Sequence, residues 1–230
     1  MSALYMRTDL NFDYGVYQSL VMTEGGNIDD YIKQLSQFLR DKSERVNKSV
    51  GELETTEWIE IPEELMEGLG SFFMNNTNKT IHNALFVMIN SFIEWAIIEL
   101  CRLTAIYIGD DFLNYKNGSG LKKAKNYLKE KLGISIAEDT DWLLFTDNQA
   151  VRNLIVHNGS NIIKDYSKGV DDQPDKDIFQ KNSDHFEYTE TGFIFILKME
   201  YIQDSHNTAK KFVAKHSANV MAELKKRIVK

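Results

Sequence analysis

Apolar side chains recur along most of this chain at the spacing of an α-helix. In Asn27–Val46 the apolar positions fall three and four residues apart, which predicts an amphipathic helix with Asn27 as its N-cap. A run that follows Asn76-Thr77 and continues to about Ile108 is apolar on nearly every side, which is typical of a central bundle helix. We expect further helices over Leu121–Leu132, Asp139–His157 and Tyr201–Ile228.

Between these helices the sequence predicts breaks, a loop and a hairpin. Gly118-Ser119-Gly120 and Gly133 bracket the helix over Leu121–Leu132. The polar stretch Lys164–Asp184 contains Pro174 and is typical of a mobile loop. Alternating residues in His185–Tyr188 and Phe193–Leu197, with a turn between them, predict a short β-hairpin. The fold is therefore expected to be mainly α, a helical bundle with a small β-hairpin insert.

Composition narrows the class of protein. The 230 residues are 43% hydrophobic and 27% charged, which excludes a disordered or fibrous chain. The single cysteine, Cys101, cannot form an internal disulfide or a thiolate cluster, and the first residues do not resemble a secretion signal, so we expect a cytoplasmic protein. Ile81–Ile98 is apolar enough to suggest a membrane span, but it carries Asn83, Asn90 and Glu94. We therefore expect a buried core helix and no membrane partner.

Charge is distributed unevenly along the chain, whose net charge is −7. Residues 1–70 hold 14 acidic and 6 basic residues, which leaves 20 acidic and 21 basic residues in 71–230. This contrast predicts an acidic N-terminal extension over 1–70, packed on a helical domain over 71–230. The acidic run Glu52–Glu67 fits either a solvated face or a docking surface for a basic partner. Four lysines fit either a solvated face or a contact with an RNA backbone: Lys122, Lys123, Lys125 and Lys129.

One short segment carries candidate chemistry. Asn153 and His157 are four residues apart on the expected helix that ends near Asn158-Gly159, and the long Arg152 side chain can reach the same region. An imidazole can move protons near neutral pH, and a guanidinium can neutralise charge that develops on a phosphate. From the residues alone, the same segment also fits an ordinary helix end with a basic last turn.

At Arg152-Asn153-Leu154-Ile155-Val156-His157, followed by Asn158-Gly159, the chain resembles the HEPN superfamily. The signature of that family is an arginine, a polar residue and, after a short spacer, a histidine. The long apolar helix before the segment and the closing helix after it also resemble the family's bundle. The resemblance covers about residues 75–230 and implies an up-and-down HEPN-type bundle, to which residues 1–70 add an N-terminal helical extension.

The resemblance implies a metal-independent endoribonuclease of the toxin or phage-defence type, with no cofactor. His157 would be the general acid and base, Arg152 would stabilise the transition state, and Asn153 would orient both. We expect Glu94, Asn90 and Asn158 to support these residues. Family members usually form homodimers with facing motifs, and some pair with an antitoxin or a nucleotidyltransferase partner. The alternative is a non-catalytic HEPN module that binds a partner protein or a nucleotide.

Overall fold

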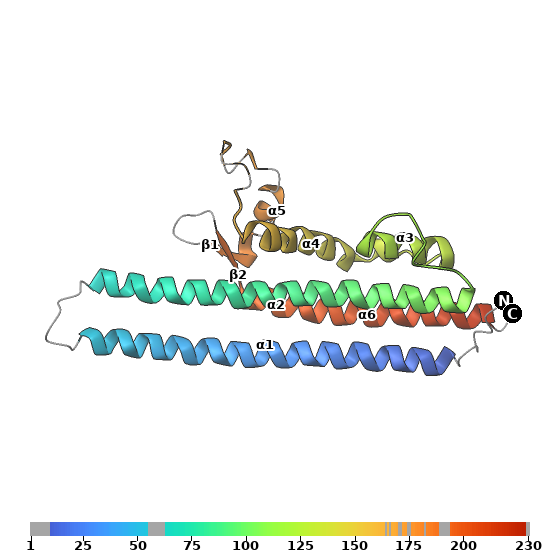
Figure 1. Cartoon of the computed structure of the whole chain (residues 1–230), viewed down its shortest axis with the longest axis horizontal. Helices are drawn as coiled ribbons and strands as arrows, with labels where there is room; N and C mark the ends of the chain where they lie inside the picture. The colour runs from blue at the N-terminus through green and yellow to red at the C-terminus, as the bar shows by residue number, and fades with distance from the viewer. Residues whose placement is uncertain are drawn as a thin grey trace. The chain divides into compact units, whose positions relative to one another are not determined.

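The computed structural model describes residues 10–54, 63–163, 165, 167–169, 172–173, 176–181, 183–188 and 194–228. Within these residues the chain is mainly α-helical, as predicted, with one small antiparallel hairpin (Figure 1). In chain order the elements are α1 (Leu10–Glu54), α2 (Glu63–Ile108), α3 (Gly120–Leu132), α4 (Thr140–Asn158), α5 (Lys176–Lys181), β1 (Phe186–Tyr188), β2 (Phe195–Leu197) and α6 (Met199–Ile228).

The first helix is longer than its sequence pattern suggests. α1 spans 45 residues, so the prediction that a helix begins at Asn27 is wrong, and Asn27 lies exposed within α1. No proline interrupts this segment. Gly25, just before Asn27, is held by tertiary contacts, because its carbonyl oxygen lies 3.2 Å from Nε2 of His206. These contacts offset the cost of about 1 kcal/mol that a glycine imposes on a helix interior.

The second helix also starts earlier than predicted. α2 begins at Glu63, directly after Pro62, and continues through Asn76-Thr77, which were predicted to cap a new helix. Their polar groups have partners within or beside the helix: Thr80 Oγ1 donates to the Asn76 carbonyl at 2.9 Å, and Lys42 donates to the Thr77 hydroxyl. α2 also crosses residue 70, the expected end of the acidic extension, without a break.

Several predicted ends are confirmed. α3 follows Ser119 and ends at Gly133, which has a left-handed φ of 73° and donates its N–H to the carbonyls of Leu128 and Lys129. α4 begins at Thr140, where Asp139 Oδ1 accepts a hydrogen bond from the Asp141 N–H at 3.0 Å. The predicted hairpin pairs β1 with β2, and α6 closes the chain.

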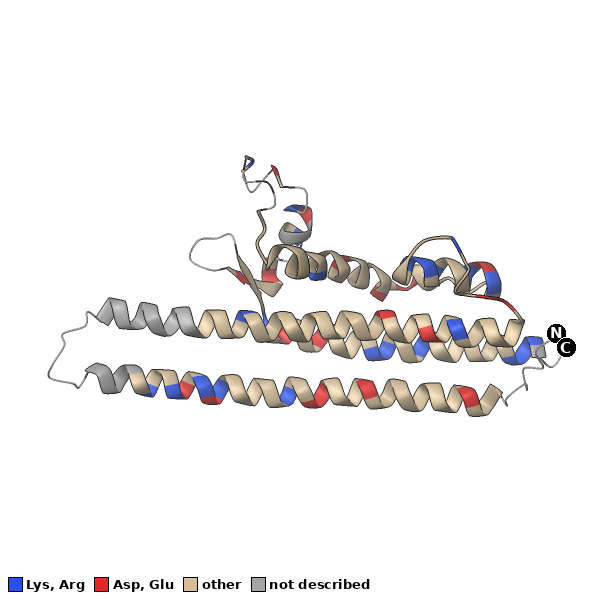
Figure 2. Cartoon of the chain, in the orientation of Figure 1, with Lys and Arg blue, Asp and Glu red and all other residues tan. Residues whose placement is uncertain are grey.

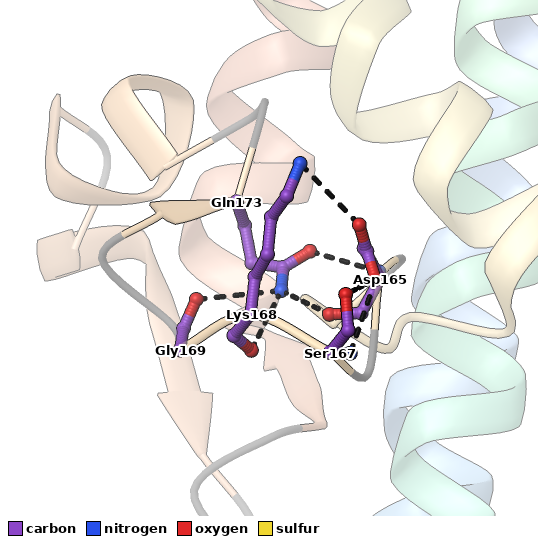
Figure 3. A network of polar contacts seen from close by, with 5 residues as sticks. All are labelled: Asp165, Ser167, Lys168, Gly169 and Gln173. Carbon is purple, nitrogen blue, oxygen red and sulfur yellow. Dashed lines mark hydrogen bonds and ion pairs between the residues drawn. The ribbon is translucent and has the colours of Figure 1, made fainter.

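The stretch Lys164–Asp184 contains more structure than the predicted loop. It includes α5 and a compact network of polar contacts centred on Gln173, which is buried (Figure 3). The Gln173 amide nitrogen donates to the carbonyls of Asp165, Lys168 and Gly169, and the amide oxygen accepts from the Asp165 N–H at 3.1 Å. The buried Gln173 amide therefore provides hydrogen-bond partners for backbone groups of a segment that forms neither a helix nor a strand.

The described residues group into two compact units, each built from segments distant in sequence. The first unit combines Met1–Asn27, Ile89–Gln149 and Ser205–Lys230, and the second combines Ile28–Met88 and Ala150–Asp204. In the first unit Tyr17 donates to the Ala96 carbonyl at 3.1 Å, and Phe145 packs edge-on against Phe212. In the second unit Phe86 stacks on Tyr201 and Lys42 reaches Thr77. Residues from 1–70 therefore contact residues from 71–230 in both units.

One part of α2 is long and apolar enough to cross a membrane by length and composition. This stretch, Met74–Ile108, has a mean hydropathy of 1.7 in its most apolar window, and 56% of that window is buried within the protein. Ile89, Ile93, Ala96, Ile97 and Leu100 are among its most buried side chains. A buried core helix of a globular protein has the same composition, as the sequence predicts for Ile81–Ile98.

Candidate functional site

The Arg152–Asn158 segment lies at the C-terminal end of α4, in the second unit. Two apolar residues of the segment, Leu154 and Ile155, are buried, whereas Asn153, Val156 and His157 are exposed and Arg152 is half-buried. The apolar side fixes the rotation of the helix about its axis. Asn153 and His157, four residues apart, are therefore held on a side of α4 that faces solvent.

Arg152 and Asn153 contact one another directly. Arg152 Nη1 donates to Asn153 Oδ1 at 3.2 Å. This bond uses one of the five guanidinium N–H groups, so the remaining groups can still bind a carboxylate or a phosphate. Among the described residues the imidazole ring of His157 has neither a hydrogen bond nor an ion pair. Its two ring nitrogens are accordingly open to a ligand or to a second chain.

Asn158 has a structural task at the end of the helix. Its side-chain nitrogen donates to the carbonyls of Asn161 at 2.6 Å and Ile163 at 3.1 Å. Gly159 follows with φ 57° and donates to the Ile155 carbonyl, which ends the helix as predicted. Asn158, one residue after His157, therefore stabilises the turn that follows α4.

Ser160 is a feature of this turn that sequence reasoning missed. It is buried, and it is the one non-glycine residue with a positive φ, 65°, among those that the structure describes. Such a conformation costs about 1–3 kcal/mol and needs support from its surroundings. Three bonds supply it: Asn83 donates to Ser160 Oγ at 2.7 Å, Phe195 donates to the Ser160 carbonyl, and the Ser160 N–H donates to Leu154.

Asn83, Asn90 and Glu94 are the polar residues of the otherwise apolar Ile81–Ile98 part of α2. Asn83 has a partner in Ser160, whose hydroxyl accepts its hydrogen bond. Asn83 and Arg152 thus belong to the same unit, the second. Asn90 and Glu94 belong to the first unit, and their expected support of Arg152 stays a prediction.

In the first unit, Glu94 has a neighbour that sequence reasoning did not indicate. Its carboxylate lies against Gly120, which has φ 50° and begins α3. A side chain at Gly120 would collide with Glu94 Oε1, so only glycine fits there without a shift of Glu94. A carboxylate at this position also complements the positive end of the helix.

The four lysines proposed as RNA contacts all lie on α3, in the first unit (Figure 2). Two have partners within the protein: Lys123 donates to the Leu113 carbonyl at 2.9 Å and lies over the Phe112 ring, and Lys125 lies 5.9 Å from the centre of the Trp142 ring. Lys122 and Lys129 are exposed. The exposed pair therefore has more freedom to contact a phosphate than Lys123 and Lys125.

The other histidines differ from His157 in their surroundings. His82 is buried, and its Nδ1 contacts the Leu197 carbonyl; burial lowers its pKa below the usual range. His206 and His216 are also buried, and His185 stacks on Tyr201. In the part of the chain that the structure describes, no group of three or more His, Cys, Asp or Glu residues could hold a metal ion.

Comparison with known proteins adds no further assignment. The chain matches no protein-family model, no curated protein and no solved structure.

Proposed function

We propose that this protein is a metal-independent endoribonuclease of the HEPN type, acting in the cytoplasm as a homodimer in a toxin or phage-defence role. The observation that carries the proposal is the exposure of Asn153 and His157 at the end of α4, together with the hydrogen bond from Arg152 to Asn153. These three residues match the family's signature. The mainly helical fold with a closing helix is compatible with an up-and-down HEPN bundle.

The proposed reaction is an internal transfer at phosphorus. The ribose 2′-oxygen attacks the phosphorus and the bond to the 5′-oxygen breaks, which leaves a 2′,3′-cyclic phosphate and a free 5′-hydroxyl. One imidazole takes the proton of the 2′-hydroxyl, and an imidazolium gives a proton to the departing 5′-oxygen. Arg152 neutralises the charge that develops on the phosphate oxygens, and Asn153 holds the guanidinium in place.

The resemblance implies that two copies complete the site. One chain offers a single His157, whereas the reaction needs a proton acceptor and a proton donor. In a homodimer with facing motifs, the second His157 can supply the other function. The exposed His157, without a partner in the described part of its own chain, is available for that arrangement.

An RNA cleavage assay with the purified full chain in excess EDTA tests the proposal. We expect cleavage that leaves 2′,3′-cyclic phosphate ends. His157→Ala should lower the rate about 10²–10⁴-fold, and Arg152→Ala about 10²–10³-fold. Matched controls are His185→Ala and Arg40→Ala, which replace exposed residues of the same types in the same unit and should keep the wild-type rate.

The outcomes separate the candidate functions. Wild-type cleavage rates in both motif variants, or loss of cleavage in EDTA, would disprove the assignment. Expression of the wild-type chain, but not of His157→Ala, should inhibit growth if the protein is a toxin. If no variant cuts RNA and the motif variants instead lose a partner protein or a nucleotide, the non-catalytic module is the better description.

A further inference from the structure

The sequence Asn-Gly-Ser occurs twice in the chain, at 117–119 and at 158–160, and the two copies have different surroundings. An asparagine that precedes glycine is prone to lose its side-chain amide spontaneously, because glycine has no Cβ to hinder attack by its own backbone nitrogen. The three residues are identical in the two copies. A large difference in their reactivity would therefore come from the fold.

The first copy lies in the loop between α2 and α3, in the first unit. Asn117 and Gly118 are both exposed, and neither belongs to a helix or a strand. The Gly118 N–H donates to the carbonyl of Lys116, two residues earlier, at 3.1 Å. The Gly118 nitrogen can therefore turn toward the Asn117 side chain without breaking a hydrogen bond of a helix or a sheet.

The side chain of Asn117 contacts α3. Its nitrogen donates to Glu130 Oε1 at 3.0 Å, and its Oδ1 accepts a hydrogen bond from Asn126 at 3.1 Å. Both contacts are exposed, so water can replace them at low cost. The bond from Asn126 also favours attack at Cγ, because it stabilises the negative charge that then develops on Oδ1.

The second copy ends α4, in the second unit, and is held by more hydrogen bonds. Asn158 is half-buried, and its side-chain nitrogen donates to the carbonyls of Asn161 and Ile163. The Gly159 nitrogen takes part in the helix end, since it donates to the Ile155 carbonyl at 3.1 Å. Attack by this nitrogen on the Asn158 side chain requires that all three bonds open together.

We propose that Asn117 is a site of spontaneous deamidation and that the fold protects Asn158 from the same reaction. The Gly118 nitrogen loses its proton to hydroxide and forms a bond to Cγ of Asn117. The side-chain nitrogen takes a proton from water and leaves as ammonia, which completes a five-membered succinimide. A water molecule then opens the ring at either carbonyl and leaves aspartate or isoaspartate at 117. This reaction does not depend on the proposed RNase activity.

The product differs from asparagine in charge and in shape. A carboxylate at 117 carries a negative charge opposite Glu130, and it cannot donate the hydrogen bond that Asn117 gives to that residue. Isoaspartate also routes the main chain through Cβ. We therefore expect the loop to lose its contact with the Glu130 side chain as conversion proceeds.

Peptide mass spectrometry of the purified full chain, aged at mildly alkaline pH, measures aspartate and isoaspartate at both positions. A sample digested without ageing corrects for conversion during digestion. Conversion at 117 should be at least about tenfold faster than at 158, because several hydrogen bonds must open before Asn158 can react. The same chain aged in denaturant is the matched control, and there the two rates should become similar.

Equal rates at the two positions of the folded chain, or a faster rate at 158, would overturn the proposal. So would an Asn117 that stays intact in the folded chain while the denatured chain converts. Asn117→Gln should suppress the acidic species that forms on ageing, because glutamine has to close a larger ring and reacts more slowly. An acidic species of unchanged abundance in that variant would show that the reaction occurs elsewhere.

Discussion

Each end of α4 is associated with a histidine, and the two histidines have opposite surroundings. At the start of the helix, in the first unit, His216 is buried and its Nε2 lies 3.0 Å from Asp139 Oδ2. Lys215 also bonds to that oxygen, at 2.7 Å. At the end of the helix, in the second unit, His157 is exposed, and the adjoining turn is held by neutral groups of Asn158 and Ser160.

This contrast separates a structural polar cluster from a candidate reactive one. A buried histidine with a fixed carboxylate partner contributes to stability, and solvent or a substrate cannot reach it. His157 is exposed, and neutral hydrogen bonds stabilise the helix end beside it. Such a histidine can bind a substrate without disturbing the fold. We therefore expect Asp139 and His216 to control stability, and His157 to control activity.

The largest effect on stability is expected from Asp139→Ala. The change removes the partner of the buried His216 and of Lys215, and it also removes the oxygen that accepts the Asp141 N–H at 3.0 Å. Leaving the buried His216 ring without its partner costs about 1–3 kcal/mol of the free energy of unfolding, and loss of the helix cap costs about a further 1 kcal/mol. Denaturant unfolding of Asp139→Ala measures this loss of stability. The control is Glu138→Ala, at the exposed neighbouring residue, which should change the free energy of unfolding by less than about 0.5 kcal/mol. A loss below about 1 kcal/mol for Asp139→Ala would place the pair among weak surface pairs.

A smaller loss of stability is expected from substitutions of Ser160, which lies just after the C-terminal end of α4. Ser160→Ala keeps the positive φ of 65° but leaves the Asn83 amide without its 2.7 Å acceptor, which should cost about 1–3 kcal/mol. Ser160→Gly loses the same bond but removes the backbone strain, so it should be less destabilising by about 1 kcal/mol. Unfolding of both variants under the same conditions gives the comparison. A more destabilising glycine would mean that strain at Ser160 is negligible.

The smallest effect is a dependence of stability on pH. Burial lowers the pKa of His216 below its usual value, although Asp139 opposes the shift. The groups around the ring are Asp139, Lys215, Asp141 and Phe212, and its buried Nδ1 faces no acceptor among the described residues. The unfolded chain therefore binds a proton at a higher pH than the folded chain, and stability falls as the pH drops below about 6.5.

His216→Gln tests this assignment. It should reduce the slope of stability between pH 7.5 and pH 5.5, where one group contributes at most about 1.4 kcal/mol per pH unit. Burial lowers the pKa of His82 as well, so part of the slope should remain. His157→Ala, at the exposed end of α4, serves as the matched control. An unchanged slope in His216→Gln would show that this ring is not responsible.

Much of the helical architecture follows from local sequence signals. The glycine at 133, the Asn158-Gly159 helix end and the alternation in the hairpin strands each act on the backbone within a few residues. Asn27 and Asn76-Thr77 carry equally strong local signals, yet they lie inside helices. Contacts made at a distance, such as Lys42 with Thr77 and His206 with Gly25, support the uninterrupted helix there.

The candidate site likewise combines residues that the sequence indicates with residues that only the fold brings together. Arg152, Asn153 and His157 could be chosen from the sequence because their spacing on one helix is a local property. The exposure of His157 and the bond between Arg152 and Asn153 agree with that choice, while their catalytic roles stay predictions. Ser160 and its partner Asn83 are 77 residues apart, and no local pattern links them.

Amino-acid order alone is sufficient to specify the mainly helical class, most helix ends and the candidate site residues near the end of α4, because backbone preferences and side-chain spacing act over short distances. Tertiary structure decides how long α1 and α2 are, which histidine is buried against Asp139 and how the strained Ser160 is held. Those features depend on side chains from distant segments, whose partners exist only after the chain has folded.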